Sequence, residues 1–414
     1  MLVRLFFFIL FLLFLDYYLF SSISSLFNRS ILSKRIFSTF YWFLSFAIYF
    51  IIYYVFINYE KRTPSVHFNN DIIISTLIFM ILFSKLLALF PLIIDDCLRF
   101  LRFVFSLFSN RGSSFVGIKI SRFDFLQKLS VFLGSTLFVT LLSGVLFGRY
   151  NFKVKKTKIK IKNWNSIING LKIVQISDLH LGSFNSIEKL EEVVEIINEQ
   201  KPDIFVFTGD LVNNYFTEAV PYINTLGKIK AKYGKFSVLG NHDYCDYVGW
   251  KRNSDKWNNN FTSMINIHKK MGFDLLMNES RIIKINDASF NLVGVENWGA
   301  GNFNKDGDLT LAMKEIDMNQ PTILLSHDPS HWTSQVLNFE KNIDLQLAGH
   351  THGMQFGIDT SHLKWSPVKA RYKQWSGLYT KFKKHIYVNT GIGHLGYAGR
   401  VGIMPEISVL ELYS

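Results

Sequence analysis

Long apolar runs dominate the first 150 residues of the chain, whereas short apolar and polar runs alternate in the remainder. Four of the long runs approach the ~20 residues that an α-helix needs to cross a bilayer. They occupy approximately residues 3–19, 41–57, 72–94 and 129–147. The pattern predicts that residues 1–150 form an N-terminal bundle of about four transmembrane helices, with the lipid bilayer as a partner.

Two charged residues interrupt these apolar runs. Asp16 stands in the first run and Lys85 in the third. A charged side chain in the hydrocarbon region is costly unless it is paired or lies near an interface. Two alternatives follow: Asp16 and Lys85 pair with each other, or both lie near helix ends.

Basic residues are distributed unequally among the loops. With four spans, loops 20–40 and 95–128 share one side of the membrane and hold nine Lys and Arg. The N-terminus, loop 58–71 and the C-terminal half share the other side. Because cytoplasmic loops carry the excess of Lys and Arg, this distribution favours an extracytoplasmic C-terminal half. If the lysines of 153–162 are also counted, the two sides nearly tie, so the side stays open.

Beyond Trp164, short strand-like runs alternate with helical patterns. Three apolar runs typical of buried strands occupy residues 171–176, 203–207 and 235–239. Helical spacing between them predicts one helix that ends before Pro202 and another over about residues 218–229. This order predicts parallel strands joined by right-handed crossovers.

The stretch 152–162 partly alternates apolar and basic residues, which is typical of an edge strand. We therefore assign residues 151–170 to a linker and edge strand. Residues 171–414 are expected to form a single α/β catalytic domain.

Polar residues of the metal-ligand type follow these three runs and two further strand-like runs, which begin at residues 323 and 344. Ligand groups gather beyond the carboxyl ends of strands in open α/β sheets. The residues in question are Asp178 and His180, Gly209-Asp210, Gly240-Asn241-His242-Asp243, His327, and His350 with His352. Side chains at i and i+2 of an extended chain point the same way, so Asp178 and His180 are expected to face one point. Each cluster alone is weak, but five in order indicate one shared site.

Charge and cysteine content exclude some classes of protein. The formal net charge is +13, yet residues 151–414 hold 31 Lys and Arg against 26 Asp and Glu. This mild excess argues against a nucleic-acid surface, which usually shows dense basic clusters. Two cysteines, Cys97 and Cys245, rule out a disulfide scaffold. No obligate protein partner is evident from the sequence.

The ordered motifs resemble the complete motif set of the calcineurin-like metallophosphoesterases, over about residues 165–414. Finer similarity to the bacterial membrane-linked branch of that family lies in residues 294–299, 327–332, 353–357 and 388–393. The resemblance implies a calcineurin-like four-layer αββα sandwich with two metals at its strand ends. It also implies an integral cell membrane protein of a bacterium.

The resemblance carries specific metal roles. The residues implied for the first metal are Asp178, His180 and His352. Asp210 is implied as the bridge, and the residues that complete the second site are Asn241, His327 and His350. A bridging carboxylate keeps two cations close enough to hold one phosphoryl group. Oxygen and nitrogen ligands without thiolate suit Mn, Fe, Zn or Co better than Mg or Ca.

His242 is the expected catalytic residue of this site. In the family it lies off the metals, on the leaving-group side, where an imidazolium can stabilise or protonate the departing oxygen. The alternative is that His242 is a third metal ligand, or that it contacts a ligand without contacting the metal. Asp243 is expected to orient a neighbouring imidazole.

Loops around the site are expected to select the substrate. The aromatic-rich segment 244–271 follows His242 and predicts either a cap over the site, a face on lipid or a buried structural element. Four later aromatic residues read as an interfacial belt, as core, or as a mixture: Trp365, Tyr372, Trp375 and Tyr379. Arg371 and Arg400 are candidates to bind a second phosphate or headgroup, with ordinary surface arginines as the alternative.

These observations favour a membrane-anchored two-metal phosphoesterase that hydrolyses a phosphomonoester, phosphodiester or pyrophosphate by attack of a metal-bridged hydroxide. The expected substrate is a lipid-linked or envelope phosphoester. One alternative is a generic phosphodiesterase or nucleotidase. The other is a non-catalytic membrane sensor or scaffold with the same fold.

Overall fold

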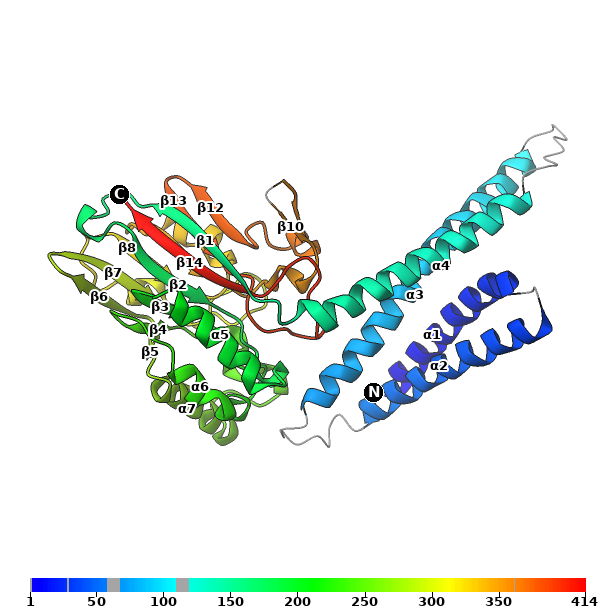
Figure 1. Cartoon of the computed structure of the whole chain (residues 1–414), viewed down its shortest axis with the longest axis horizontal. Coiled ribbons are helices and arrows are strands. Elements are labelled where there is room, and N and C mark those ends of the chain that lie inside the picture. The colour runs from blue at the N-terminus through cyan, green and yellow to red at the C-terminus, as the bar shows by residue number, and fades with distance from the viewer. Residues whose placement is uncertain (1, 28–29, 58–67, 109–118, 361) are drawn as a thin grey trace. The chain divides into compact units, whose positions relative to one another are not determined.

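The computed structural model describes residues 2–27, 30–57, 68–108, 119–360 and 362–414, and divides into two compact units. The first unit holds the long helices as far as Ser143, except Phe68 and Asn69. The second unit holds those two residues and the chain from Gly144 onward, with the β-sheets (Figure 1). Membrane-type helices and mixed sheets therefore occupy separate parts of the chain.

The first unit consists of four long helices. They are α1 (Leu2–Ile23), α2 (Ile31–Ile57), α3 (Phe68–Phe108) and α4 (Lys119–Ser143). Within the described residues, four helical stretches are long and apolar enough to cross a membrane, at Val3–Phe27, Ile31–Ile57, Ile72–Phe108 and Asp124–Gly148. Many of their Phe and Leu side chains are exposed, as expected for surfaces that contact lipid.

An ion pair lies inside this helical unit. Nζ of Lys85 in α3 is 2.8 Å from Oδ1 of Asp16 in α1, and Asp16 is buried. The hydroxyls of Tyr41 and Tyr49 in α2 donate hydrogen bonds to the same carboxylate, and Lys85 also donates to Ser45 at 2.9 Å. Of the two alternatives for Asp16 and Lys85, mutual pairing is confirmed. The pair joins three helices through one buried carboxylate.

The second unit contains two six-stranded sheets. In spatial order, the first sheet holds β1 (Lys153–Lys160), β14 (Glu406–Tyr413), β2 (Leu171–Ile176), β3 (Ile204–Phe207), β4 (Lys235–Ser237) and β5 (Asp274–Leu275). The second holds β12 (Gly377–Lys381), β13 (Lys384–Val388), β9 (Leu345–Ala348), β8 (Thr322–Leu325), β7 (Ala288–Gly294) and β6 (Glu279–Ile285). A short hairpin consists of β10 (Ile358–Asp359) and β11 (Lys364–Trp365).

Helices cover the outer faces of both sheets, which gives four layers (Figure 1). The helices are α5 (Ile187–Glu199), α6 (Ile223–Gly227), α7 (Asp255–Lys270), α8 (Leu309–Ala312) and α9 (Ser330–Ser334). Successive strand residues point to opposite faces, so in β2 Val174 packs toward α5, α6 and α7, whereas Ile173 packs between the sheets. The αββα sandwich after a membrane bundle, expected from the sequence, is confirmed.

Strand pairing agrees with the predicted order near the site. Strands β2, β3 and β4 are parallel neighbours, as are β7, β8 and β9. The lysine-rich stretch forms β1 at the edge of the first sheet, where it pairs with β14 in parallel. The helix predicted over residues 218–229 is wrong in extent, because α6 covers only Ile223–Gly227 and Pro221 sits in a separate short turn.

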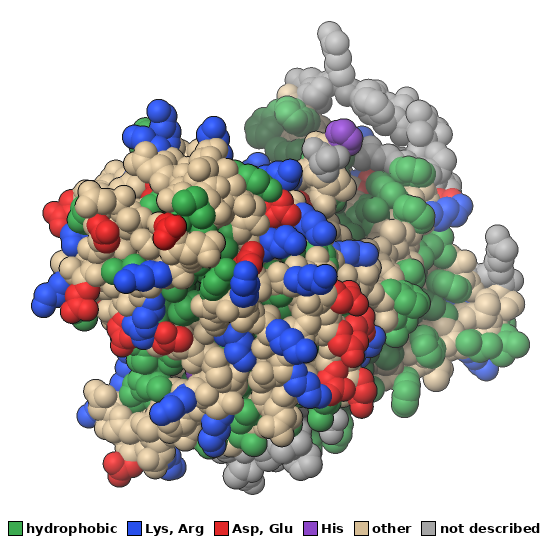
Figure 2. Space-filling model, turned by 60° about the vertical axis from the view of Figure 1, so that its left-hand side comes forward, with side chains coloured by type: hydrophobic (Ala, Val, Ile, Leu, Met, Phe, Trp, Pro, Cys, Tyr) green, Lys and Arg blue, Asp and Glu red, His purple; other side chains and the backbone are tan. Residues whose placement is uncertain are grey.

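The surface of the second unit is mixed in charge. On the face shown in Figure 2, Lys and Arg side chains are scattered among Asp and Glu side chains over the folded domain. This arrangement agrees with the small positive balance of residues 151–414.

The buried ion pair of the helical unit generates a prediction. Lys85→Met should destabilise the full chain in detergent by about 3–5 kcal/mol, because it leaves the Asp16 carboxylate buried without its cation. The double variant Asp16→Leu with Lys85→Met removes both charges and should cost less. Thermal unfolding measures both changes.

The control is Lys128→Met, which breaks an exposed pair with Asp124 at 2.6 Å. Exposed pairs contribute little, so this variant should unfold close to the wild-type temperature. Equal destabilisation by the single and double variants would contradict the prediction.

Candidate metal centre

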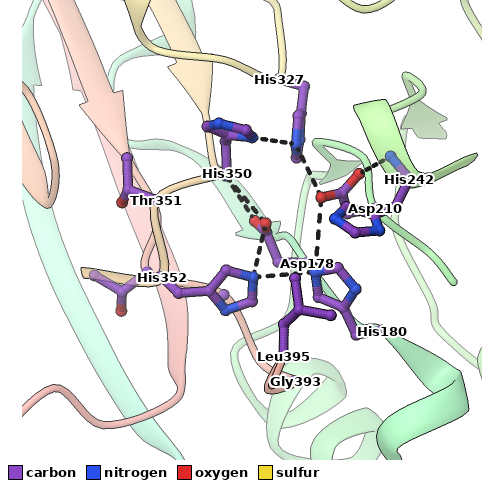
Figure 3. A network of polar contacts seen from close by, with 12 residues as sticks. Asp178, His180, Asp210, His242, His327, His350, Thr351, His352, Gly393 and Leu395 are labelled. Atoms are coloured by element: carbon purple, nitrogen blue, oxygen red, sulfur yellow. Dashed lines mark hydrogen bonds and ion pairs between the residues drawn. The ribbon is translucent and has the colours of Figure 1, made fainter. Parts of the chain in front are cut away.

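The predicted site residues follow the carboxyl ends of five strands. Asp178 and His180 come after β2, and Asp210 comes after β3. The remaining residues follow β4, β8 and β9: Asn241, His242, His327, His350 and His352. Figure 3 shows the carboxylates of Asp178 and Asp210 among the imidazole rings. Both sheets therefore contribute to one cluster.

The first ligand group consists of Asp178, His180 and His352, whose ligand atoms all lie within 4.8 Å of one another. Nε2 of His352 is 3.2 Å from Oδ1 of Asp178 and 3.0 Å from Nε2 of His180. The Asp178 carboxylate also accepts hydrogen bonds from the backbone N–H of His350, at 3.1 and 2.9 Å. All three side chains of the group are buried.

The second group consists of Asp210, His327 and His350, which meet the same 4.8 Å criterion. Nε2 of His327 is 3.2 Å from Oδ2 of Asp210 and 3.2 Å from Nδ1 of His350. On the other side of its ring, Nε2 of His350 is 2.8 Å from the hydroxyl of Tyr372. Tyr372 therefore holds His350 with Nδ1 toward the site.

Asp210 lies between the two groups (Figure 3). Its Oδ2 is 3.6 Å from Nε2 of His180 in the first group and 3.2 Å from Nε2 of His327 in the second. Its Oδ1 accepts a hydrogen bond from the backbone N–H of His242 at 2.9 Å. A single carboxylate thus reaches both groups, which is the position that a bridging ligand requires.

The donor set fits metal ions. Nδ1 of His327 lies 2.7 Å from the carbonyl oxygen of Thr208, so Nδ1 carries the proton when the ring is neutral. Nε2 of His327 then presents a lone pair to the carboxylate of Asp210. Buried acceptor atoms that face one another repel unless a cation or a proton lies between them. Backbone support of a ligating imidazole is also typical of metal sites.

Asn241 stands outside both groups but offers a free ligand atom. Its amide nitrogen donates a hydrogen bond to the hydroxyl of Tyr247 at 2.7 Å. Its amide oxygen is buried and has no hydrogen-bond partner among the described residues. A buried polar atom without a partner is costly, so this oxygen is available to a cation. The assignment of individual ligands stays a prediction.

Five of these residues have a strained backbone. The φ angles are 52° at Asp178, 44° at His180, 58° at Asp210, 71° at His350 and 49° at His352. Residues other than glycine rarely adopt positive φ, and such strain is concentrated at functional sites. The expectation that Asp178 and His180 converge by strand alternation is therefore wrong, since β2 ends at Ile176 and left-handed turns bring them together.

The electrostatics of the cluster keep its carboxylates ionised. Burial acts to raise the pKa of Asp178, but His352 outweighs it and the pKa falls below the usual range. Burial and His242 lower the pKa of His180. Burial also acts to lower the pKa of His327, yet the Asp210 carboxylate raises it to about 10. A proton on Nε2 of His327 occupies the position of a cation, so metal binding must release that proton.

His242 is oriented by a loop that the sequence did not single out. Nδ1 of His242 is 2.7 Å from the carbonyl oxygen of Asn213. The backbone N–H of Asn213 in turn donates to the carboxylate of Glu218 at 2.6 Å, and the next two N–H groups donate to the same side chain. A backbone carbonyl leaves no sequence signal, so this support could not be predicted.

The expected role of Asp243 is wrong. Its carboxylate accepts hydrogen bonds from the backbone N–H groups of Gly240, Asp210 and Leu211, at 2.8 to 2.9 Å, rather than from an imidazole. Asp243 is fully buried. Asp243 therefore connects the loop after β3 with the loop after β4 by hydrogen bonds. One of these bonds holds the backbone of Asp210 in position.

The aromatic segment 244–271 divides between core and site. Tyr244 and Trp257 are buried, and both rings stack on Phe261. Tyr247 is 49% exposed, and its ring lies 4.5 Å from the imidazole of His242. Most of the segment is thus a structural element, and Tyr247 is the residue whose ring lies next to His242.

The two candidate arginines differ completely in environment. Arg400 is fully buried, donates to the carbonyl oxygen of Thr390 at 2.9 Å, and lies 3.3 Å from Nδ1 of His352. Burial lowers the pKa of its guanidinium to about 10, against the opposing effect of Asp178. The hypothesis that Arg400 binds a second phosphate is wrong, because its side chain has no solvent-accessible surface that a ligand could contact. Arg371 is exposed.

Comparison with known proteins assigns the family. The sequence profile of the calcineurin-like phosphoesterases matches residues 171–354. An uncharacterized metallophosphoesterase of Bacillus subtilis (strain 168), YkuE, is 31% identical over 256 residues, which cover 59% of this chain and 80% of YkuE. The chain belongs to the calcineurin-like phosphoesterases. It is therefore a metallophosphoesterase, a hydrolase that acts on ester bonds.

The membrane part of this metallophosphoesterase matches a family profile of its own, and further relatives match parts of the chain. A profile described as a probable calcineurin-like phosphoesterase transmembrane domain matches residues 3–149. An uncharacterized metallophosphoesterase of Helicobacter pylori (strain J99) is 30% identical over 329 residues, 76% of this chain and 79% of that protein. The phosphodiesterase YaeI of Escherichia coli (strain K12) is 27% identical over 242 residues, 58% of this chain and 82% of YaeI. The family predicted from the motifs is confirmed.

Close backbone approach at the centre generates a prediction. A Cβ atom on Gly349 would lie 1.9 Å from Oγ of Ser177 and 2.3 Å from Oδ2 of Asp178. Gly349→Ala should therefore displace the Asp178 carboxylate and destabilise the metallophosphoesterase unit by about 1–3 kcal/mol. Thermal unfolding of the full chain in detergent measures the effect.

Gly227→Ala is the matched control, because a Cβ atom there meets nothing within 4 Å. That variant should unfold at the wild-type temperature or slightly above it, since alanine favours helix more than glycine does. Equal losses in both variants would show that the contact at Gly349 is not critical.

Proposed function

We propose that the chain is a membrane-anchored, dinuclear metal-dependent phosphoesterase that hydrolyses a phosphomonoester, phosphodiester or pyrophosphate bond. The observation that carries the proposal is the Asp210 carboxylate, which lies 3.6 Å from His180 and 3.2 Å from His327. One ligand shared between two groups is the arrangement that holds two cations within reach of one phosphoryl group.

Each residue has a proposed role. Asp178, His180 and His352 hold the first cation, and Asp210 bridges to the second. The residues that complete the second site are Asn241, His327 and His350. The ions are divalent, and the donor set suits Mn, Fe, Zn or Co. When bound, such ions neutralise charge on a phosphoryl group and activate a water molecule for in-line attack.

The protein's own residues orient the reaction. Tyr372 and the Thr208 carbonyl fix the rings of His350 and His327, so their ligand nitrogens face inward. Burial of the cluster excludes bulk water and strengthens each charge interaction. His242 is held through Nδ1 by the Asn213 carbonyl, which leaves Nε2 free to hold a proton at the departing oxygen.

A lipid-linked or envelope phosphoester is the proposed substrate. The presence of four candidate membrane spans in the same chain supports a substrate that is itself associated with a membrane. We assign residues 1–150 to the membrane region, 151–170 to the linker and edge strand, and 171–414 to the catalytic domain. The unequal distribution of Lys and Arg among the loops supports an extracytoplasmic catalytic domain.

Removal of the bridging charge tests the proposed function. The detergent-solubilised full chain with added Mn should hydrolyse bis-p-nitrophenyl phosphate, and Asp210→Asn should reduce the rate to background because the amide no longer holds two cations. Release of p-nitrophenol and elemental analysis of bound metal measure the two effects.

Asp287→Asn provides the control, because that carboxylate is exposed in the turn between β6 and β7. It should retain both metal and activity. Metal binding without hydrolysis in the wild-type chain would instead favour the sensor or scaffold alternative.

The role of His242 gives a separate prediction. His242→Ala should keep two bound cations but lose about 10²–10⁴ in kcat, because it removes the group that protonates the leaving oxygen. The loss should be smaller for a leaving group of low pKa, such as p-nitrophenol, than for an alkyl alcohol. Loss of one cation on elemental analysis would identify His242 as a ligand instead.

A further inference from the structure

Arg371 is held beside the metal centre by aromatic rings. It directly follows the short helical turn Pro367–Ala370, and its side chain is exposed. Its guanidinium carbon lies 5.4 Å from the ring centre of Phe303 and 5.5 Å from that of Tyr372. Two cation–π contacts restrict this side chain without neutralising its charge.

The same two rings enclose a candidate metal ligand. The Phe303 ring centre is 5.3 Å from that of His350 at an interplanar angle of 84°, and the Tyr372 ring centre is 5.4 Å away at 73°. The Tyr372 hydroxyl is also 2.8 Å from Nε2 of His350. The rings of Phe303 and Tyr372 therefore contact both the Arg371 guanidinium and His350 of the second ligand group.

Arg371 differs from Arg252 and Arg281 of the same unit in having no carboxylate partner among the described residues. Arg252 is paired with Asp246 at 2.5 Å and with Asp306 at 2.7 Å. Arg281 is likewise paired with two carboxylates. Among the residues that the structure describes, none forms an ion pair with Arg371. Its positive charge therefore remains available to a ligand.

The geometry suits recognition of an anion. A guanidinium held on its face by aromatic rings keeps its N–H edge free, and that edge pairs bidentately with phosphate oxygens. The cations held by the ligand residues would bind the reacting phosphoryl group. A second phosphate group next to it needs its own cation, because two adjacent anionic groups repel each other in a partly desolvated site.

We propose that Arg371 is a substrate-binding residue that takes a second phosphate group, so the preferred substrates are diphosphate esters rather than simple monoesters or diesters. This inference rests on the proposed phosphoesterase function and adds a substrate class to it. The shared chemistry is a diphosphate, whether it belongs to a soluble nucleotide sugar or to an isoprenoid lipid.

Steady-state kinetics of Arg371→Gln and Arg371→Lys in the detergent-solubilised full chain test the inference. The substrates are bis-p-nitrophenyl phosphate, a uridine diphosphate sugar, and an isoprenyl diphosphate in micelles. Arg371→Gln should lower kcat/KM for a diphosphate about 10–100-fold, mainly through KM, because one charge-assisted contact is lost. Hydrolysis of bis-p-nitrophenyl phosphate should change less than about 2-fold on the same grounds.

Arg371→Lys should recover part of the loss, since lysine keeps the charge but not the planar fork. Lys369→Gln is the matched control, because it removes an exposed positive charge from the same turn without touching the aromatic rings. It should leave all substrates unaffected. Whichever diphosphate depends more strongly on Arg371 identifies the soluble or the lipid source.

Several results would overturn the inference. Equal losses on all three substrates would mean that Arg371 only supports the fold, and no loss on either diphosphate would mean that it does not bind them. A wild-type chain that cleaves bis-p-nitrophenyl phosphate but neither diphosphate would overturn the substrate class and leave the phosphoesterase function standing. No hydrolysis of any substrate would overturn the proposed function itself.

Discussion

Mutual repulsion among buried acceptor atoms is the constraint on which the metallophosphoesterase unit depends. Two carboxylates and four imidazoles meet in two groups whose ligand atoms lie within 4.8 Å of one another. Backbone donors offset part of the cost: His350 donates to Asp178, and His242 donates to Asp210. Positive φ at the ligands adds strain of about 1–3 kcal/mol per residue. Such a cluster persists only where the surrounding structure is rigid. A cation that removes the repulsion stabilises the folded state.

The αββα sandwich provides that rigid structure. Apolar packing between the two sheets is strong but non-directional, so it does not by itself align the strand ends. Next to the site, buried hydrogen bonds align the strand ends. The side-chain amide of Gln175 in β2 donates to the carbonyl oxygen of Ala348 in β9 at 2.9 Å and to Thr208 at 3.0 Å. This bridge connects one sheet with the other directly before the residues that carry the ligands.

Sequence reasoning could predict which residues form the centre, because each follows an apolar strand and has the chemistry of a metal ligand. The pairing of Asp16 with Lys85 was one of two alternatives open from sequence, since an unpaired charge in lipid is too costly to persist. The route by which Asp178 reaches the site was not predictable, because left-handed φ angles depend on tertiary contacts. Nothing in the sequence distinguishes Arg371 from Arg400. In the structure, Arg400 packs against His352, whereas Arg371 lies against the ring of Phe303.

The same packing extends to the residues that begin at Gly144 in the metallophosphoesterase unit. The turn Gly144–Gly148, which follows α4, belongs to the metallophosphoesterase unit. The backbone N–H of Arg400 donates to the carbonyl oxygen of Gly144 at 3.1 Å, and a Cβ atom on Gly148 would lie 1.9 Å from the carbonyl oxygen of Arg400. The Arg400 side chain then reaches Nδ1 of His352 at 3.3 Å. Residues Gly144–Gly148, at the end of the fourth candidate span, are therefore packed within this unit, against the same Arg400 that contacts His352.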